Sequence, residues 1–290
     1  MVTLTNDFLT VTITTHGAEL TSIKDNHTNL EYLWQADPAS WGRHAPVLFP
    51  IVGSLKDDTY RYQGQSYHLT QHGFARDSEF TVSAQSADSA TFTLTDSPAT
   101  RAKYPFAFTL QLIYALDNNS LRVTYRVENP AQSPMYFGIG GHPAFRVPLA
   151  PDTAYDDYYL EFDPRKSRVI IPLRDGRIDY DQRTLAGTDV NQQISHAGFA
   201  QDAQIYELNG RSSLSIKSDR TPHGVTLTTA DAPFIGVWSQ YPNLGDFVCL
   251  EPWWGIADTV DATGELTEKF GINTLAGGAT FEHGFGITIF

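Results

Sequence analysis

The chain has 290 residues, of which 18% are charged and 12% aromatic, and its formal net charge is -13 at pH 7. These values are typical of a folded protein with a sizeable core and exclude a disordered chain. The excess of acidic groups argues against nucleic acid or an anionic membrane as the main partner. The single cysteine, Cys249, excludes an intrachain disulfide framework and a metal site built from several cysteines.

Two features of the sequence bear on where the protein works. The first residues lack the charged and then apolar pattern of a secretory signal, and no apolar run is long enough to cross a membrane. A single cysteine also suits a reducing compartment. The sequence therefore predicts a cytoplasmic protein, either a monomer or a homodimer.

Alternating apolar and polar residues predict short strands along almost the whole chain. The segment 1–23 is rich in Thr, Val and Ile, and residues 60–69 are typical of a hairpin that turns at 63–65. Further strands are predicted at 79–85, 90–95, 106–116, 120–128, 135–139, 158–162, 205–208, 214–217, 225–229, 234–239, 247–250 and 286–290.

Helical patterns are limited to residues 99–104 and 259–270, and the segments 149–157 and 173–200 are predicted to be rich in loops. No repeat and no linker divides the chain. Many short strands with regular turns predict one all-β domain over residues 1–290, with two large sheets packed face to face.

Glu251 follows the strand predicted over 247–250 and directly precedes Pro252 and Trp253. Because strand side chains alternate, Glu251 is expected on the same face as Cys249. Proline cannot donate to a sheet ladder, so pairing is expected to stop at Pro252. A carboxylate at a strand end beside an indole face is suited to a sugar ring, although an ordinary core arrangement fits the same residues.

Five other polar side chains lie at predicted strand ends or in loops, where site residues gather: Arg43, His72, Arg76, His142 and Asp202. His142 is the strongest candidate. The two glycines before it permit a positive φ or a close approach of another chain, and the proline after it fixes φ. The other four also have simple structural interpretations, as surface ion pairs or turn residues.

Three chemistries compete for these residues. A metal site built from His44, His72, His142 and Glu251 lacks the spacing that would make it specific. A glycosidase would use Glu251 and Asp202 as its carboxylate pair. General acid–base catalysis fits directly, because a carboxylate accepts a proton at neutral pH and an imidazole can donate one.

Four stretches occur in an order that resembles the aldose 1-epimerase (galactose mutarotase-like) family, and within it the bacterial LacX-type branch. They are His-Gly-Phe-Ala-Arg (72–76), Gly-Gly-His-Pro-Ala-Phe (140–145), Asp-Ala-Gln-Ile-Tyr (202–206) and Glu-Pro-Trp-Trp-Gly-Ile-Ala-Asp (251–258). The resemblance extends from Arg43 to the last predicted strand. It implies a β-supersandwich and the interconversion of α and β anomers of a free or phosphorylated hexose.

The resemblance also implies the roles of the site residues. Catalysis is assigned to Glu251 as the base and His142 as the acid. Substrate binding is assigned to His72, Asp202, Arg43, Arg76, Phe145 and Trp253. Glu251 would take the proton of the anomeric hydroxyl while His142 protonates the ring oxygen, and the open aldehyde would rotate and close on its other face. No electron is transferred, so neither a redox cofactor nor a metal is expected.

One departure leaves the substrate open. The family pattern has a basic residue after the glycine of the Phe-Pro-x-x-Gly stretch, and Ser54 stands there. Arg43 and Arg76 also resemble the pair that hexose-6-phosphate 1-epimerases use for phosphate, since guanidinium groups suit phosphate oxygens. The net charge favours a neutral hexose. A carbohydrate-binding or sugar-sensing protein that has lost catalysis is the alternative from another class.

Overall fold

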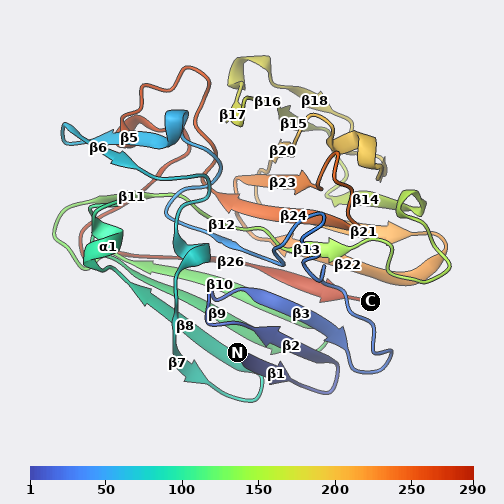
Figure 1. Ribbon diagram of the computed structural model, residues 1–290. Coiled ribbons are helices and arrows are strands. Elements are labelled where there is room, and N and C mark those ends of the chain that lie inside the picture. The colour runs from blue at the N-terminus through green and yellow to red at the C-terminus, as the bar shows by residue number, and fades with distance from the viewer.

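The computed structural model describes residues 1–290 and consists mainly of antiparallel strands arranged as two large sheets (Figure 1). The first sheet has nine strands, in the order β19 (Gln192–Gln193), β14 (Tyr158–Asp163), β21 (Ser212–Ser218), β22 (Thr221–Thr229), β26 (Thr280–Ile289), β10 (Ser120–Glu128), β9 (Thr109–Asp117), β8 (Ser89–Thr95) and β7 (Thr81–Gln85).

The second sheet has eight strands. Their order is β18 (Thr184–Ala186), β15 (Arg168–Ile171), β20 (Gln204–Glu207), β23 (Phe234–Trp238), β24 (Phe247–Trp254), β12 (Ile139–Gly141) and β4 (Val47–Leu48), with β13 (Ala144–Arg146) also paired to β24. The predicted all-β architecture with two large antiparallel sheets is therefore confirmed.

Smaller elements frame the two sheets. The strands are β1 (Val2–Thr5), β2 (Leu9–Ile13) and β3 (Leu20–Asp25) in one sheet, and the pairs β5 (Thr59–Tyr62) with β6 (Gln65–His68), β11 (Met135–Phe137) with β25 (Asn273–Leu275) and β16 (Leu173–Arg174) with β17 (Arg177–Ile178). The helices are α1 (Pro98–Arg101) and the 3-10 turns η1 (Lys56–Asp58), η2 (Ala75–Asp77), η3 (Tyr155–Asp157), η4 (Tyr180–Gln182), η5 (His196–Phe199) and η6 (Leu266–Glu268). None of the helices has the length and apolarity needed to span a bilayer.

The main core follows directly from strand alternation. In β10, for example, Leu121, Val123 and Tyr125 are buried, while the residues between them are partly or fully exposed. Each such side chain contributes about 1.5–3 kcal/mol when it is fully removed from water. The main core cluster contains 61 buried residues, from Val2 to Ile289.

Two segments differ from their predicted structure. Residues 259–270 contain only the turn η6 and no longer helix. The segment 173–200, predicted to be loops, contains the strands β16 to β19, of which β16 and β17 form a hairpin around Asp175 and Gly176. These strands are two or three residues long, which is too short for a periodicity signal.

The strand that carries Glu251 is longer than predicted. β24 continues through Pro252 to Trp254, and all eight of its residues are buried. The Leu250 N–H donates to Pro143 O. The backbone nitrogen of Pro252, two residues later, points to the same edge of the strand. There the partner changes from β13 to β12, so the missing N–H of proline falls between two ladders. The expectation that pairing stops at Pro252 was therefore wrong, and Glu251 lies within a central strand.

Candidate active site

Glu251 lies on β24 opposite Gly236 of β23, and only 1% of its surface is exposed. The predicted alternation holds here: Val248 and Leu250 belong to the main core, whereas Cys249 packs in a separate cluster. The Glu251 carboxylate thus points away from the main core, toward the ring of His142.

His142 lies in the short segment between β12 and β13. Its N–H donates to Pro46 O at 3.1 Å, and its Nε2 atom is 3.3 Å from Glu251 Oε2. The indole of Trp41 stacks on the imidazole, with centroids 4.9 Å apart and planes at 27°. The ring of Trp238 packs edge-on against the same imidazole, with centroids 5.5 Å apart. The imidazole is therefore held between a carboxylate and two indoles.

The two glycines before His142 act through close packing. Both belong to β12, and neither has a positive φ, so the strained turn that their sequence suggested is not formed. A Cβ on Gly140 would lie 2.7 Å from Trp253 Cδ1, and one on Gly141 would lie 2.7 Å from the hydroxyl of Tyr125. The absent side chain of Gly140 lets Trp253 approach the strand that leads to His142, and that of Gly141 leaves room for the Tyr125 hydroxyl.

Burial controls the charge of the central pair. Desolvation, with a contribution from the negative charge of Asp202, raises the pKa of Glu251 well above its usual range. Burial, reinforced by the positive charges of Arg76 and Arg43, lowers the pKa of His142 to about 3. The two shifts favour a carboxylic acid beside a neutral imidazole.

Both members of the pair line a cavity of about 300 Å³, the central cavity. This volume suits a small ligand. The cavity is lined by Trp41, Gly53, Gln71, His72, Arg76, His142, Leu173, Gly176, Asp202, Ala203, Ile205, Trp238, Gln240, Glu251, Trp253 and Ala257.

His72 enters the cavity from the segment after β6, with φ at 67°. Its Nδ1 atom accepts a hydrogen bond from the Gly53 N–H at 3.1 Å. Burial and the nearby His142 and arginine charges keep the pKa of His72 well below its usual range, so the ring is neutral. A neutral imidazole that accepts at Nδ1 carries its proton at Nε2, which makes His72 a donor for a ligand.

Three more predicted residues line the cavity. Asp202 sits in a turn with φ at 76° and its Oδ1 accepts from the Ala203 N–H at 2.8 Å. Arg76 donates from Nη2 to Gln71 O, and its buried Nε has no hydrogen-bond partner, since the Asp77 carboxylate is 3.7 Å away. The Nε1–H of Trp253 is also buried and makes no well-formed hydrogen bond, but it lies near the Glu251 carboxylate and works against the rise in the pKa of that group. Both donors belong to residues in the cavity wall, where a ligand oxygen would satisfy them.

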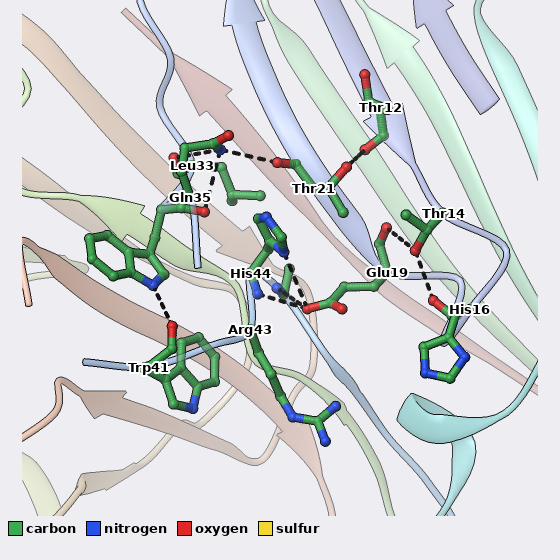
Figure 2. Close-up of polar contacts among 12 residues, drawn as sticks. Thr12, Thr14, His16, Glu19, Thr21, Leu33, Gln35, Trp41, Arg43 and His44 are labelled. Carbon is green, nitrogen blue, oxygen red and sulfur yellow. Dashed lines mark hydrogen bonds and ion pairs between the residues drawn. The ribbon is translucent and has the colours of Figure 1, made fainter. Parts of the chain in front are cut away.

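Two predicted residues do not line the cavity. Phe145 is fully buried in the main core, because alternation along β13 turns Ala144 toward Cys249 and Phe145 to the opposite face. Arg43 donates from Nη2 to Asp77 Oδ1 at 2.8 Å, and its side chain is 32% exposed. The guanidinium of Arg43 extends away from Glu19 in Figure 2. The structure brings together the other six predicted residues.

Two larger hollows lie elsewhere on the molecule. One, of about 550 Å³, lies on the other side of the β16–β17 hairpin, where Arg174 rather than Leu173 is in the wall. The other, of about 490 Å³, lies over β10, β22 and β26. Neither contains a residue of the four sequence motifs that surround the central pair, except Asp258 at the edge of the first.

Comparison with known proteins supports this reading of the motifs. A family model described as aldose 1-epimerase matches residues 1–271. The chain belongs to the aldose 1-epimerase family. Two relatives, the chromosomal and plasmid forms of protein LacX from Lactococcus lactis subsp. lactis, are each 34% identical over 297 residues, which cover 99% of this chain and of theirs. The resemblance to the LacX-type branch is therefore confirmed.

Solved structures of this epimerase family match the whole chain. A galactose mutarotase related enzyme from Lactobacillus acidophilus is 46% identical, with a TM-score of 0.98 over 100% of this chain and 97% of that one. A galactose mutarotase-like protein from Lactobacillus casei ATCC 334 is 31% identical, with a TM-score of 0.89 over 100% of both chains. The fold is that of the galactose mutarotase-like proteins.

Ser54, where the sequence departs from the epimerase pattern, lies beside the cavity wall and outside the lining. Its backbone O accepts from the Asp258 N–H at 2.9 Å, and its hydroxyl lies close to Gly176 of the β16–β17 hairpin, within 3.3 Å of where a Cβ would stand. A longer basic side chain at this position would reach the hairpin that borders the cavity.

Sequence reasoning did not assign four polar or aromatic residues of the central cavity: Trp41, Gln71, Trp238 and Gln240. Trp41 and Gln71 were within reach, because Trp41 stands two residues before the candidate Arg43 and Gln71 directly precedes the motif at 72–76. Trp238 ends β23, and Gln240 follows it in an irregular segment without a local signal.

His142, Cys249 and Glu251 each offer one possible metal ligand, all within 4.8 Å of one another. A zinc-like ion would need the thiolate and the carboxylate forms. Burial raises the pKa of both Cys249 and Glu251, which favours their neutral forms. His44, which the metal hypothesis included, does not line the cavity. This donor set is thus better suited to proton transfer.

Proposed function

We propose that this protein is an aldose 1-epimerase that interconverts the α and β anomers of a hexose by opening and closing the pyranose ring. The observation that carries the proposal is the contact of His142 Nε2 with Glu251 Oε2, at 3.3 Å, in the wall of a cavity of about 300 Å³. A carboxyl group and an imidazole in one cavity are the two groups that general acid–base catalysis of ring opening needs.

The proposed reaction requires that Glu251 and His142 together carry one proton. The ring opens from the state with an ionised Glu251 and a protonated His142. Glu251 takes the proton of the anomeric hydroxyl, His142 gives its proton to the ring oxygen, and the C1–O5 bond breaks as C1–O1 becomes a carbonyl. The pair is then a carboxylic acid and a neutral imidazole, the state that burial favours.

Ring closure runs the same steps in reverse. After rotation about C1–C2, Glu251 returns its proton to the carbonyl oxygen, His142 takes the proton of the C5 hydroxyl, and the ring closes on the other face of C1. Because the two reacting oxygens are bonded to one carbon, an acid and a base in contact with each other can serve both.

Other groups of the cavity are proposed to hold the sugar. The Nε2–H of His72 and the unpartnered donors of Arg76 and Trp253 are available for sugar oxygens. Asp202 supplies a carboxylate that can accept from sugar hydroxyls. The indoles of Trp41 and Trp238 supply apolar surface in the cavity wall against which a pyranose can pack.

A neutral hexose is favoured over a hexose 6-phosphate. Arg43 and Arg76 meet at Asp77, with contacts of 2.8 Å to Oδ1 and 3.7 Å to Oδ2. The Asp77 carboxylate therefore pairs with both guanidinium groups, which makes them less available for a phosphate.

Mutarotation of pure anomers, followed by polarimetry, tests the proposal. We expect the protein to accelerate the mutarotation of glucose or galactose and to act less well on their 6-phosphates. Preference for a 6-phosphate would overturn the substrate assignment. Saturable sugar binding in calorimetry without any rate acceleration would replace the epimerase by the alternative, a carbohydrate-binding or sugar-sensing protein.

A further inference from the structure

A turn of the N-terminal sheet is hydrogen-bonded to residues 41–46, the segment that lies against His142. The turn joins β2 to β3, and its last residue, Glu19, has a side chain that is only 13% exposed. Glu19 Oε1 accepts hydrogen bonds from the N–H of His44 at 2.7 Å and from that of Ala45 at 2.9 Å (Figure 2). One carboxylate oxygen thus fixes two consecutive peptide groups in a segment without regular secondary structure.

The segment 41–46 is also hydrogen-bonded to the backbone around His142. His44 O accepts from the Ala144 N–H at 2.9 Å, and Pro46 O accepts from the His142 N–H at 3.1 Å. Glu19 therefore holds one side of a short ladder whose other side carries the imidazole.

The same segment also carries the indole that covers His142. Trp41 stacks on the imidazole at 4.9 Å, and its backbone O accepts from the Trp34 Nε1–H at 2.8 Å (Figure 2). Trp34 fixes one end of the stretch that bears Trp41, and Glu19 fixes the other end at His44 and Ala45. Glu19 itself does not line the cavity.

We infer that Glu19 is a positioning residue: its bonds to His44 and Ala45 hold residues 41–46 so that His142 keeps its ring orientation toward Glu251. The inference rests on the proposed epimerase function for its effect on the reaction, but not for its effect on the loop. The expected effect on the reaction comes from local geometry, because a displaced general acid lowers the rate of the chemical step even when the substrate still binds.

Three variants test the inference. Glu19→Ala removes the acceptor, and Glu19→Gln keeps a carbonyl oxygen that can accept from both amides. Asp25→Ala is the matched control, because Asp25 Oδ1 also accepts from two consecutive N–H groups, those of His27 at 2.6 Å and Thr28 at 3.0 Å, in a loop that does not line the cavity.

The readouts are amide hydrogen exchange, resolved by residue, and mutarotation kcat and KM, at a temperature where circular dichroism finds every variant folded. For Glu19→Ala we expect exchange at His44 and Ala45 to accelerate about tenfold or more and kcat to fall by about tenfold, with a smaller change in KM. Glu19→Gln should recover most of both effects. Asp25→Ala should accelerate exchange only at residues 27 and 28 and leave kcat unchanged.

Unchanged exchange at His44 and Ala45 in Glu19→Ala would overturn the inference, and so would faster exchange with an unchanged kcat. If Glu19→Ala does not fold, Glu19→Asp, whose carboxylate is one methylene shorter, carries the same test with the same expected directions. If the wild-type protein does not accelerate mutarotation, the proposed function fails, and exchange at the backbone N–H of His142 decides whether Glu19 orders the segment bonded to it.

Discussion

The Nε2 atom of His142 lies 3.3 Å from the Oε2 atom of Glu251, although these residues belong to segments more than 100 positions apart in the sequence. Both groups are desolvated, and the shifts of their pKa values have opposite signs. A pair with such shifts keeps a constant proton count over a wide range of pH, which is the condition under which it can take one proton and give one in the same step.

The pH dependence of stability is the first consequence. From ordinary pKa values of 4.5 and 6.5, the Glu251 pKa is raised and the His142 pKa is lowered to about 3. Between pH 4.5 and 6.5 the unfolded pair and the folded pair each bind one proton, so the pair contributes no slope there. Above pH 6.5 only the folded pair keeps its proton, and below pH 4.5 only the unfolded pair binds a second, so stability falls on both sides.

Denaturant unfolding of the wild type and of the double variant Glu251→Gln/His142→Asn measures this contribution. We expect the difference in the free energy of unfolding to be level between pH 4.5 and 6.5. It should fall by up to about 1.4 kcal/mol per pH unit above pH 6.5, until the raised Glu251 pKa is passed, and likewise below pH 4.5 toward pH 3. A difference that is level above pH 6.5 and rises with pH between 4.5 and 6.5 would mean that Glu251 is ionised in the folded protein.

His72 should matter for both stability and rate. His72→Ala leaves the Gly53 N–H without its acceptor, which should cost about 1–3 kcal/mol in the free energy of unfolding. It also removes the proposed Nε2–H donor to the sugar, so kcat/KM should fall by about tenfold to hundredfold. His68→Ala, at an exposed position of β6, is the control. A loss of stability with unchanged kcat/KM would leave His72 with a structural role only.

Gly140 should not tolerate a methyl group. In Gly140→Ala the new Cβ would lie 2.7 Å from Trp253 Cδ1 and 3.0 Å from Pro252 O, and overpacking of this kind costs about 1–3 kcal/mol. Gly286→Ala places the same methyl group on β26, where nothing lies within 4 Å. Chemical unfolding should find only the first variant destabilised. Equal stability of the two variants would contradict the close packing of Trp253 on β12.

Asp77 should select against anionic sugars. Asp77→Asn removes the carboxylate that Arg43 and Arg76 share, so two guanidinium groups become available for phosphate. Calorimetry with glucose 6-phosphate or galactose 6-phosphate should give Asp77→Asn an affinity about tenfold higher than that of the wild type. This corresponds to about 1.4 kcal/mol of binding free energy. Asp7→Asn, an exposed change of the same charge, controls for the net charge. Equal affinities in all three proteins would show that Asp77 does not make the two guanidinium groups less available for a phosphate.

The parts of the fold that depend on local signals could be predicted from the sequence. The strand 120–128 was predicted with its observed bounds because its alternation is regular. The hairpin predicted at 60–69 is observed at 59–68, and Gln63 and Gly64 adopt the positive φ values of its turn. The partner of a strand is not a local property. Pro252 looked like the end of β24 because the change of partner from β13 to β12 cannot be read from the sequence.

The site could be predicted where a residue lies inside a recognisable motif. His142, His72, Asp202 and Glu251 each do, and all four line the cavity. The same reasoning included Phe145, which shares a motif with His142 but faces the core on β13. Contributions that act through the backbone, such as that of Glu19 to His44 and Ala45, leave no pattern in the sequence, because any residue at those positions would offer the same N–H groups.

The central claim is that Glu251 and His142 open the sugar ring as base and acid. The most direct measurement is the mutarotation rate of α-D-galactose or α-D-glucose, followed by polarimetry, with Glu251→Gln and His142→Asn beside the wild type and circular dichroism to establish that both variants fold. The account predicts that the wild type accelerates the reaction and that each variant loses at least about 100-fold in kcat, the usual contribution of a general acid or base. Wild-type rates in both folded variants would contradict it.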